Sequence, residues 1–246
     1  MKANKIDITP VSEKWNEFID NVIRASKLSK NMAIKKEDDK LLLYTVDGTI
    51  AKTNAMIYYL LDWDDYFSPI DKSFFLPIED GTSFAKSLEF YYDDPNTKLE
   101  LDFRENEIIS AKLKSKKLKV VIKKGEEFVI RNITSQMITQ INNKSYSLFN
   151  FQLTAEGLSD INKLIKLHKG EEIISCRIDK NKIVFHQGNR WYYNLADIDD
   201  CPSDFKNFAF PKEYFKLIGS KEITVYCYPN FIMFSDLMVG VDKTFE

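Results

Sequence analysis

The residues of this sequence that are best suited to chemistry are two groups of aspartates. They are Asp62, Asp64 and Asp65 in one acidic stretch, and Asp197, Asp199 and Asp200 in another. Carboxylates spaced in this way could hold Mg²⁺ for phosphoryl chemistry. No glycine-rich phosphate loop accompanies them, and acidic loops are more often solvated turns. We therefore expect no metal site, and the roles of the loops at 62–65 and 197–204 stay open.

Histidines and cysteines offer no better candidate for catalysis. His168 lies at a predicted helix end, where the helix dipole favours its charge, and His186 lies at a strand end. The cysteines Cys176, Cys201 and Cys227 are widely spaced, without a Cys-x-x-Cys pair, which favours reduced thiols in or near the core of an intracellular protein. The sequence predicts no catalytic residue, no enzyme activity and no cofactor.

The chemistry that the sequence does offer is positive charge on helices. Opposite the apolar stripe of each of four predicted helices stands at least one basic residue. These residues are Arg24, Lys86, Lys163, Lys166, Lys212 and Lys216. If the four helices lie on one side of the sheets, the charges form a positive surface that suits the phosphate backbone without reading sequence. A lysine opposite an apolar face is also an ordinary solvated residue, and only the fourfold recurrence favours the nucleic-acid interpretation.

Apolar spacing and capping residues define the four helices. The first spans 13–26 behind Ser12 as its cap, and the second follows a cap at Thr82 or Ser83. The third spans 155–167, with Thr154 as its cap and Gly170 just past its end, and the fourth spans 212–218. Each helix has one apolar face to bury and one charged face to expose.

Period-two patterns predict the strands between these helices. In the first half they are 33–36, 41–46, 49–59, 73–77, 99–103, 107–113 and 117–122, with a tight turn at Asp47-Gly48 and an acidic, aromatic connection at 60–70. In the second half they are 174–178, 182–185, 191–195, 208–211, 221–228, 231–235 and 237–241. Helix, strand, turn and strand recur in the same order in both halves. The repeat predicts an α+β fold of two similar domains, each with two helices packed on antiparallel sheet.

Length and composition agree with two globular domains. The chain has 246 residues, 44% hydrophobic and 29% charged, with 8 Gly and 7 Pro. We expect an N-terminal domain at 1–125, a connection at 126–145 and a C-terminal domain at 146–246. The net charge of -2 says nothing about nucleic acid. We also expect no signal peptide, no membrane partner and a cytoplasmic location, because the longest apolar runs are far shorter than about 20 residues.

Three segments resemble the DNA sliding clamps, specifically the phage replication clamps with two domains per subunit. They are the first helix with the hairpin at 31–53, which includes the Val46-Asp47-Gly48-Thr49 turn, the helix and hairpin at 153–185, and the ending at 231–246. Together they cover about half of the chain. The resemblance implies the DNA-clamp fold, a closed homotrimeric ring and helices that line its hole, so that the six basic residues above would face DNA.

The resemblance also implies partners and a function. The partners are duplex DNA, a replicative DNA polymerase, a clamp loader ATPase and further copies of the chain. The function is that of a processivity factor that encircles DNA and tethers the polymerase, in the host cytoplasm if the chain is phage-encoded. The alternatives are a β-rich phage structural or adaptor protein with a two-domain interaction module and, more distantly, a metal-dependent enzyme acting on nucleic acid.

Two further segments have more than one interpretation. Residues 112–124 hold seven lysines. Their alternation with Leu118, Val120 and Ile122 is typical of an exposed or edge strand, which we favour over a second nucleic-acid site. The aromatic residues Trp63, Tyr66 and Phe67 belong either to a partner groove or to a satellite core.

Overall fold

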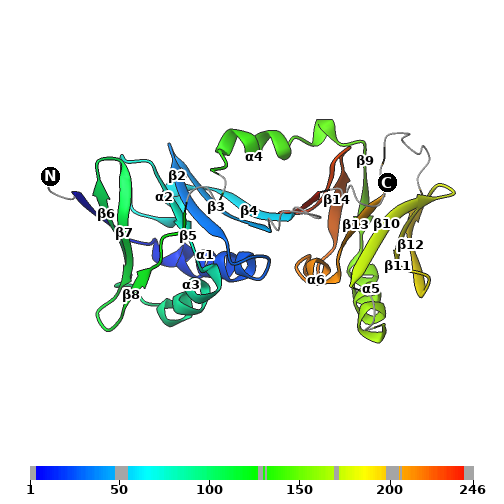
Figure 1. Ribbon diagram of the computed structural model, residues 1–246, viewed down its shortest axis with the longest axis horizontal. Coiled ribbons are helices and arrows are strands. Elements are labelled where there is room, and N and C mark those ends of the chain that lie inside the picture. Colours follow the sequence, from blue (N-terminus) through cyan, green and yellow to red (C-terminus); the bar gives the residue numbers. More distant parts are fainter. Residues whose placement is uncertain are drawn as a thin grey trace. The chain divides into compact units, whose positions relative to one another are not determined.

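The computed structural model describes residues 4–47, 55–126, 130, 132–168, 172–197, 205 and 207–240 (Figure 1). These residues form two compact units. The first unit holds the described residues up to 46 and from 57 to 141, and the second holds those of 47–56 and from 142 onward. Both units combine antiparallel sheet with a few helices, which is the α+β class that the sequence predicts.

The strands of the first unit form two sets. One set has the order β1 (Asn4–Ile8), β6 (Lys98–Arg104), β7 (Glu107–Lys114) and β8 (Lys119–Ile122). The other has the order β5 (Phe74–Ile78), β2 (Met32–Glu37), β3 (Lys40–Asp47) and β4 (Ala55–Asp62). Strand β4 continues to Asp62, three residues into the predicted connection at 60–70. Residues 48–54 lie outside the described residues, so only Asp47 of the predicted Asp47-Gly48 turn is described.

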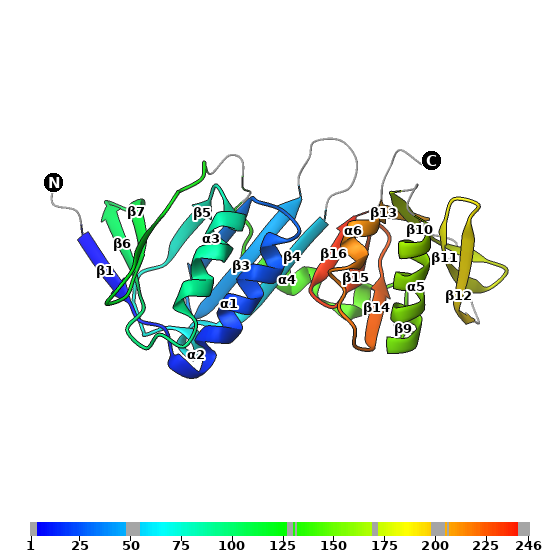
Figure 2. The same cartoon turned by 90° about the horizontal axis from the view of Figure 1, so that it is seen from below.

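The helices of the first unit are α1 (Ser12–Ser26), α2 (Trp63–Tyr66), α3 (Gly81–Leu88) and α4 (Ser135–Ile141), with a 3-10 turn, η1, at Glu89–Tyr91. Helices α1 and α3 contact each other and cover the same face of the strands β5, β2, β3 and β4 (Figure 2). The apolar stripe of α1 is buried as predicted, through Trp15, Phe18, Ile19 and Val22. These apolar side chains fix α1 on the sheet.

Both predicted N-caps in the first unit are wrong. Ser12 is already helical, and Val11 precedes α1 with extended backbone and no side-chain cap. Helix α3 is capped by Asp80, whose Oδ1 accepts a hydrogen bond from the Ser83 N–H at 2.9 Å. Asp80 displaces the predicted caps Thr82 and Ser83 because its carboxylate reaches the first free N–H groups. The charge–dipole interaction stabilises the start of α3 further.

The strands of the second unit also form two sets. One has the order β12 (Trp191–Asp197), β11 (Lys182–Gln187), β10 (Ile173–Asp179) and β13 (Phe208–Pro211). The other has the order β16 (Leu237–Gly240), β15 (Phe231–Phe234), β14 (Ile223–Cys227) and β9 (Phe149–Leu153). The predicted strands at 174–178, 182–185 and 208–211 are confirmed. The thiols of Cys176 and Cys227 are buried and free, whereas Cys201 lies outside the described residues.

Two helices of the second unit, α5 (Ala155–Leu167) and α6 (Lys212–Phe215), lie on one side of the strands β9, β14, β15 and β16 (Figures 1 and 2). Thr154 caps α5 as predicted, because its Oγ1 accepts a hydrogen bond from the Gly157 N–H at 3.1 Å. Gly170 lies outside the described residues. Helix α6 ends three residues earlier than predicted. The chain tightens through an Ile218 N–H to Phe215 carbonyl bond and turns at Gly219, whose φ is 92°.

No helix among the described residues is long and apolar enough to cross a membrane.

Candidate nucleic-acid interface

Helix α5 carries two of the predicted DNA-facing residues. Lys163 and Lys166 are both exposed on the side of α5 opposite its buried Leu158, Ile161 and Ile165. Lys163 donates to the carboxylate of Asp160, one turn earlier, at 2.9 Å. This hydrogen bond raises the pKa of Lys163, so the side chain stays charged. The carboxylate of Asp160 nevertheless offsets the positive charge that Lys163 presents to solvent. Lys166 has no such partner among the described residues.

A hollow of about 390 Å³ lies beside these two lysines. Its lining residues are Ala155, Leu158, Ser159, Asn162, Lys163, Lys166 and Ser220. The hydroxyls of Ser159 and Ser220 were not recognised as candidate site residues in the sequence, where isolated serines carry no signal. The two hydroxyls and the ammonium group of Lys166 can donate to a phosphate oxygen at the mouth of this otherwise largely apolar hollow.

Helix α6 places its two lysines differently. Lys212 is half-buried, with 13% of its side chain exposed, and donates to Glu172 at 2.8 Å. Lys216 follows the last turn of α6 and is exposed. Of the two, only Lys216 offers a charge that no carboxylate of the described chain neutralises. Lys212 instead joins α6 to the start of β10.

The first unit shows the same division between engaged and free charges. The Arg24 guanidinium on α1 is half-buried and donates to the hydroxyl of Tyr59 on β4 at 3.2 Å. Lys86 on α3 is exposed and has no ion-pair partner in the described part of the chain. The structure therefore brings Arg24 back onto the sheet and leaves Lys86 toward solvent.

The N-terminal half of α1 is acidic. Its exposed residues include Glu13, Glu17 and Asp20. The Tyr66 hydroxyl donates to Glu17 at 2.5 Å, and the Tyr92 hydroxyl donates to Asp20. Burial and the bonded carboxylate raise the pKa of Tyr92 to about 12, so that the tyrosine stays a donor. The acidic side chains at this end of α1 repel phosphates, so the predicted DNA-facing residues of the first unit are Arg24, near the other end of α1, and Lys86 on α3.

The aromatic residues at 63–67 and the lysine run at 112–124 lie in the core and in edge-strand structure, respectively. Trp63, Tyr66 and Phe67 are buried, with 1%, 3% and 2% exposed, and Trp63 packs against Phe67 at a ring distance of 4.8 Å. They form a satellite core and no groove. The lysine run begins in β7 and continues through β8, and β8 lies at the edge of its set of strands as predicted. In the same run Lys114 pairs with Glu100 at 2.5 Å, and Lys112 pairs with Asp102 at 2.9 Å.

Among the described residues, no three His, Cys, Asp or Glu side chains come together in a way that could hold a metal ion. All three aspartates of the first acidic stretch, Asp62, Asp64 and Asp65, are among the described residues. Asp62 binds Lys40 at 2.5 Å. Of the second group only Asp197 is described, since 198–204 lie outside the described residues. Its carboxylate lies 3.7 Å from the ammonium of Lys182.

Comparison with solved structures identifies the architecture. A β clamp of Helicobacter pylori bound to a DNA ligase peptide matches 97% of this chain with a TM-score of 0.59 at 12% identity. A PCNA2–PCNA3 complex of Sulfolobus tokodaii matches 97% with a TM-score of 0.59 at 12% identity. A putative DNA polymerase III β subunit of Eubacterium rectale matches 98% with a TM-score of 0.60 at 14% identity.

The chain has the fold of the DNA sliding clamps. It spans 65% of the Helicobacter β clamp chain and 66% of the Eubacterium chain, but 98% of the Sulfolobus chain. No protein-family model matches the chain, and no curated protein matches its sequence. The clamp fold is thus recognised from the arrangement of its elements, and the fold prediction made from the sequence is confirmed.

Proposed function

We propose that this chain is a DNA sliding clamp, a processivity factor that encircles duplex DNA and tethers the replicative DNA polymerase to it. The observation that carries the proposal is the clamp fold over 97% of the chain, shared with a β clamp and a PCNA complex. Exposed lysines on the helices that cover the sheets support it. A ring holds DNA by topology, so weak backbone contacts are sufficient and no catalytic residue is required.

The proposed DNA-facing residues are Arg24, Lys86, Lys163, Lys166, Lys212 and Lys216. Lys86, Lys166 and Lys216 are the principal contacts in this proposal, because each is exposed and no carboxylate of the described chain lies within ion-pair distance. Arg24, Lys163 and Lys212 are engaged by Tyr59, Asp160 and Glu172 and contribute less. Sparse, unpaired charges suit a protein that must slide, because strong contacts would hold it in place.

We further propose that three copies close into a homotrimeric ring through the edges of their sheets. Strand β8 ends one set of strands in the first unit, and β12 ends one set in the second. The lysine-rich segment before and within β8 is basic, whereas β12 ends at Asp197 and leads into the acidic stretch at 197–204. Opposite charges favour pairing β8 of one copy with β12 of the next, and such head-to-tail contacts generate rings.

Partner proteins follow from the same proposal. A clamp loader ATPase opens or closes the ring around DNA, and the polymerase binds the assembled clamp. One of the similar structures is a clamp bound to a DNA ligase peptide. That complex supports a partner site for short peptides on this chain as well.

Two measurements test the proposal without a loader. The native mass, measured across protein concentrations, is expected to reach three times the 28.8 kDa of the subunit. Binding to linear duplex DNA is then compared with binding to a closed circle of the same sequence. A preassembled ring threads onto free ends and is expected to prefer the linear form. A strict monomer that binds both forms equally contradicts the clamp proposal and favours a phage adaptor protein.

A further inference from the structure

A row of three lysines crosses neighbouring strands of the first unit. Lys98 on β6 lies directly opposite Lys114 on β7, which lies directly opposite Lys119 on β8. Directly opposite residues of antiparallel strands project to the same face of a sheet. Here that face points away from the core, because the adjacent residues Leu99 and Leu113 are buried on the other side. Like charges in opposite positions destabilise a sheet, so a bound anion would relieve a cost that the row imposes.

Carboxylates neutralise only the middle of this row. Glu100 on β6 pairs with Lys114 at 2.5 Å. The side chains of Lys98 and Lys119 are exposed, and no carboxylate of the described residues lies within ion-pair distance of either ammonium group. Residues 112–124 supply no carboxylate of their own. The two outer members of the row are therefore positive charges without a counter-charge.

The turn between β7 and β8 adds two further lysines. The Ser115 N–H donates to the Leu118 carbonyl at 2.8 Å, and the Ser115 hydroxyl oxygen accepts from the N–H groups of Lys117 and Leu118 at 3.3 Å each. Lys116 and Lys117 lie at the tip of this turn and are exposed. The backbone that carries them is thus ordered before a ligand arrives, which lowers the entropic cost of binding.

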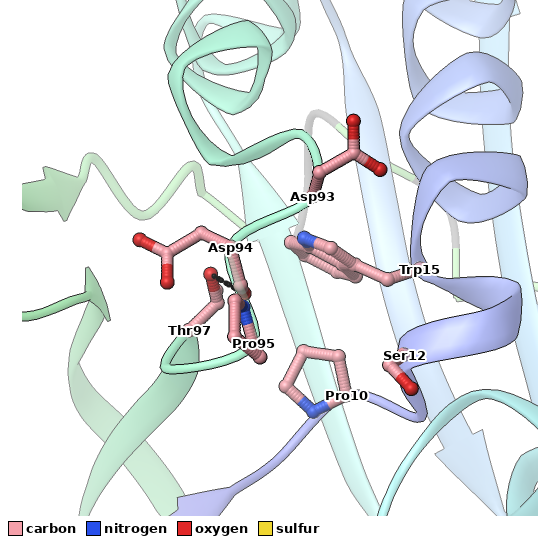
Figure 3. Close-up of a pocket in the computed structure, with 7 residues that line it drawn as sticks. All are labelled: Pro10, Ser12, Trp15, Asp93, Asp94, Pro95 and Thr97. Atoms are coloured by element: carbon pink, nitrogen blue, oxygen red, sulfur yellow. Dashed lines mark hydrogen bonds between the residues drawn. The ribbon is translucent and has the colours of Figure 1, made fainter.

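The loop that leads into β6 is ordered directly before Lys98. The Thr97 hydroxyl donates to the Asp94 carbonyl at 2.9 Å (Figure 3). The same loop borders a cavity of about 190 Å³ whose wall includes Trp15. Because Trp15 is 3% exposed, the cavity offers no aromatic face to a ligand. The groups in this region that can bind a ligand are therefore the exposed lysines.

Asp94 affects only one of these lysines. The backbone hydrogen bond from Asn96, with smaller effects of the Ser115 hydroxyl and the charge of Lys116, holds the pKa of Asp94 below its usual range. Asp94 is therefore ionised at neutral pH and offsets part of the charge of Lys116. Lys117, like the outer members of the row, has no carboxylate within ion-pair distance in the part of the chain that the structure describes.

The row and the turn together form a lysine surface, which consists of Lys98, Lys114, Lys116, Lys117 and Lys119. We propose that this lysine surface binds the phosphate backbone of duplex DNA, at a second site besides the helices. Phosphates attract ammonium groups without any reading of sequence. A protein partner fits less well, because protein interfaces are depleted in lysine and enriched in arginine and aromatic residues. An unpaired strand also fits less well, since its bases stack on aromatic rings and the exposed apolar residues here, Leu118 and Val121, are aliphatic.

The lysine surface does not depend on ring assembly. Pairing between copies in the proposed ring uses the backbone edge of β8, whereas the lysine side chains project from the face of the strands. A ring that holds DNA by topology alone needs a free DNA end or an opening. The lysine surface instead allows the protein to bind DNA that has no ends, before any ring closes around it.

The test is binding of the full-length protein to a relaxed, closed circle of duplex DNA, measured by filter binding at several salt concentrations. Lys98→Gln combined with Lys119→Gln removes both outer charges of the row. The slope of log affinity against log salt concentration is expected to fall in magnitude by up to about 0.9 for each lysine. Lys144→Gln combined with Lys180→Gln removes two exposed charges elsewhere and is expected to leave the slope unchanged.

Two further measurements keep the result interpretable. The Lys98 and Lys119 double variant removes like-charge neighbours and no ion pair, so its stability to urea is expected to equal or exceed that of wild type. Native mass is measured for both double variants, so that a change in assembly is not mistaken for lost DNA contacts. If the first double variant does not fold, Lys98→Gln combined with Lys117→Gln replaces it.

Three results overturn the proposal. One is an unchanged salt slope in the variant that lacks the outer lysines. Another is no binding of wild type to the duplex circle. The third is tighter binding to a closed single-stranded circle of the same sequence, which shows that unpaired DNA is the ligand. The clamp proposal is judged separately, by native mass and by the preference for linear DNA over the circle.

Discussion

The ammonium group of Lys163 lies 2.9 Å from the carboxylate of Asp160, three residues earlier on α5. This pair divides the lysines of α5 into two kinds, because Lys166 on the next turn is exposed without an acidic partner among the described residues. A basic side chain on a helix is therefore not automatically a DNA contact. A carboxylate within ion-pair distance of the side chain weakens its attraction to the phosphate backbone.

Removing the acidic partner is expected to strengthen DNA binding. In Asp160→Asn, Lys163 keeps its charge and loses the competing carboxylate. The logarithm of the affinity for duplex DNA falls linearly with the logarithm of the salt concentration. The magnitude of this slope is expected to increase by up to about 0.9 for each Lys163 that contacts a phosphate. Fluorescence anisotropy at several salt concentrations measures the slope. Asp160→Asn with Lys163→Gln is the matched control and should restore the original slope. An unchanged slope in Asp160→Asn alone would place Lys163 away from DNA.

Replacing Trp63 is expected to destabilise the first unit, because Trp63 belongs to its core. The side chain is 1% exposed, and its ring packs on Phe67 at 4.8 Å and on Phe74 at 5.7 Å. Trp63→Ala removes these contacts and is expected to cost about 3–5 kcal/mol of unfolding free energy. Urea denaturation measures the loss. Phe90→Ala is the control, since Phe90 is 75% exposed and its loss should change stability by about 0.5 kcal/mol or less. Equal effects of the two substitutions would exclude the core assignment.

The regular elements of this chain were predictable because their signals are local. The stripe of apolar residues and the Thr154 cap define α5, and alternation defines β10 and β11. The bounds of all three elements agree with those predicted from the sequence within about two residues. The cap of α3 was missed because an aspartate before a glycine is also typical of a turn. Trp63 could not be assigned, since burial depends on α1 and β5, which are distant in the sequence.

The candidate site was predictable in part for the same reason. Asp160 and Lys163 stand three residues apart, so their pairing was visible in the sequence as a helical charge pair. The partners of Arg24 and Lys212 are Tyr59 and Glu172, separated from them by 35 and 40 residues. No local pattern predicts such contacts. The acidic residues of α1 are visible in the sequence, but their hydrogen bonds to Tyr66 and Tyr92 join residues 49 and 72 positions apart.

Glu100 is expected to make the stability of the first unit depend on acid pH. Its side chain is 5% exposed on β6, and hydrogen bonds from Lys114 and Lys5 lower its pKa to about 2. Because the folded pKa is below the unfolded value of about 4.3, the stabilisation is present above pH 5 and is lost as the pH falls toward 2. The unfolding free energies of wild type and Glu100→Gln, measured in urea, should therefore differ at pH 7, differ less as the pH falls below about 4, and converge only near pH 2 and below. Glu107→Gln serves as the exposed control. A difference that does not depend on pH would contradict the ionic origin of the stabilisation.

The segment that leads into α4 is held to the sheet of the first unit by three polar contacts. Lys35, with 10% of its side chain exposed, donates to the Ile133 carbonyl at 3.2 Å. The Tyr44 hydroxyl accepts from the Ile133 N–H at 3.2 Å, and Glu37 accepts from the Ser135 N–H at 2.6 Å. Glu37 also pairs with Lys35 at 2.9 Å. One carboxylate thus both neutralises a buried lysine and caps α4.

Loss of this carboxylate is expected to release the segment locally. Glu37→Ala leaves Lys35 buried without its charge partner and is expected to cost about 3–5 kcal/mol, concentrated where the contacts are made. Hydrogen exchange should therefore accelerate at Ile133 and Ser135 much more than in β6 and β7. The double variant Lys35→Met with Glu37→Ala removes the unpaired charge and should recover part of the protection. Uniform acceleration across the first unit would show that Glu37 stabilises the whole unit, because local release of α4 leaves β6 and β7 protected.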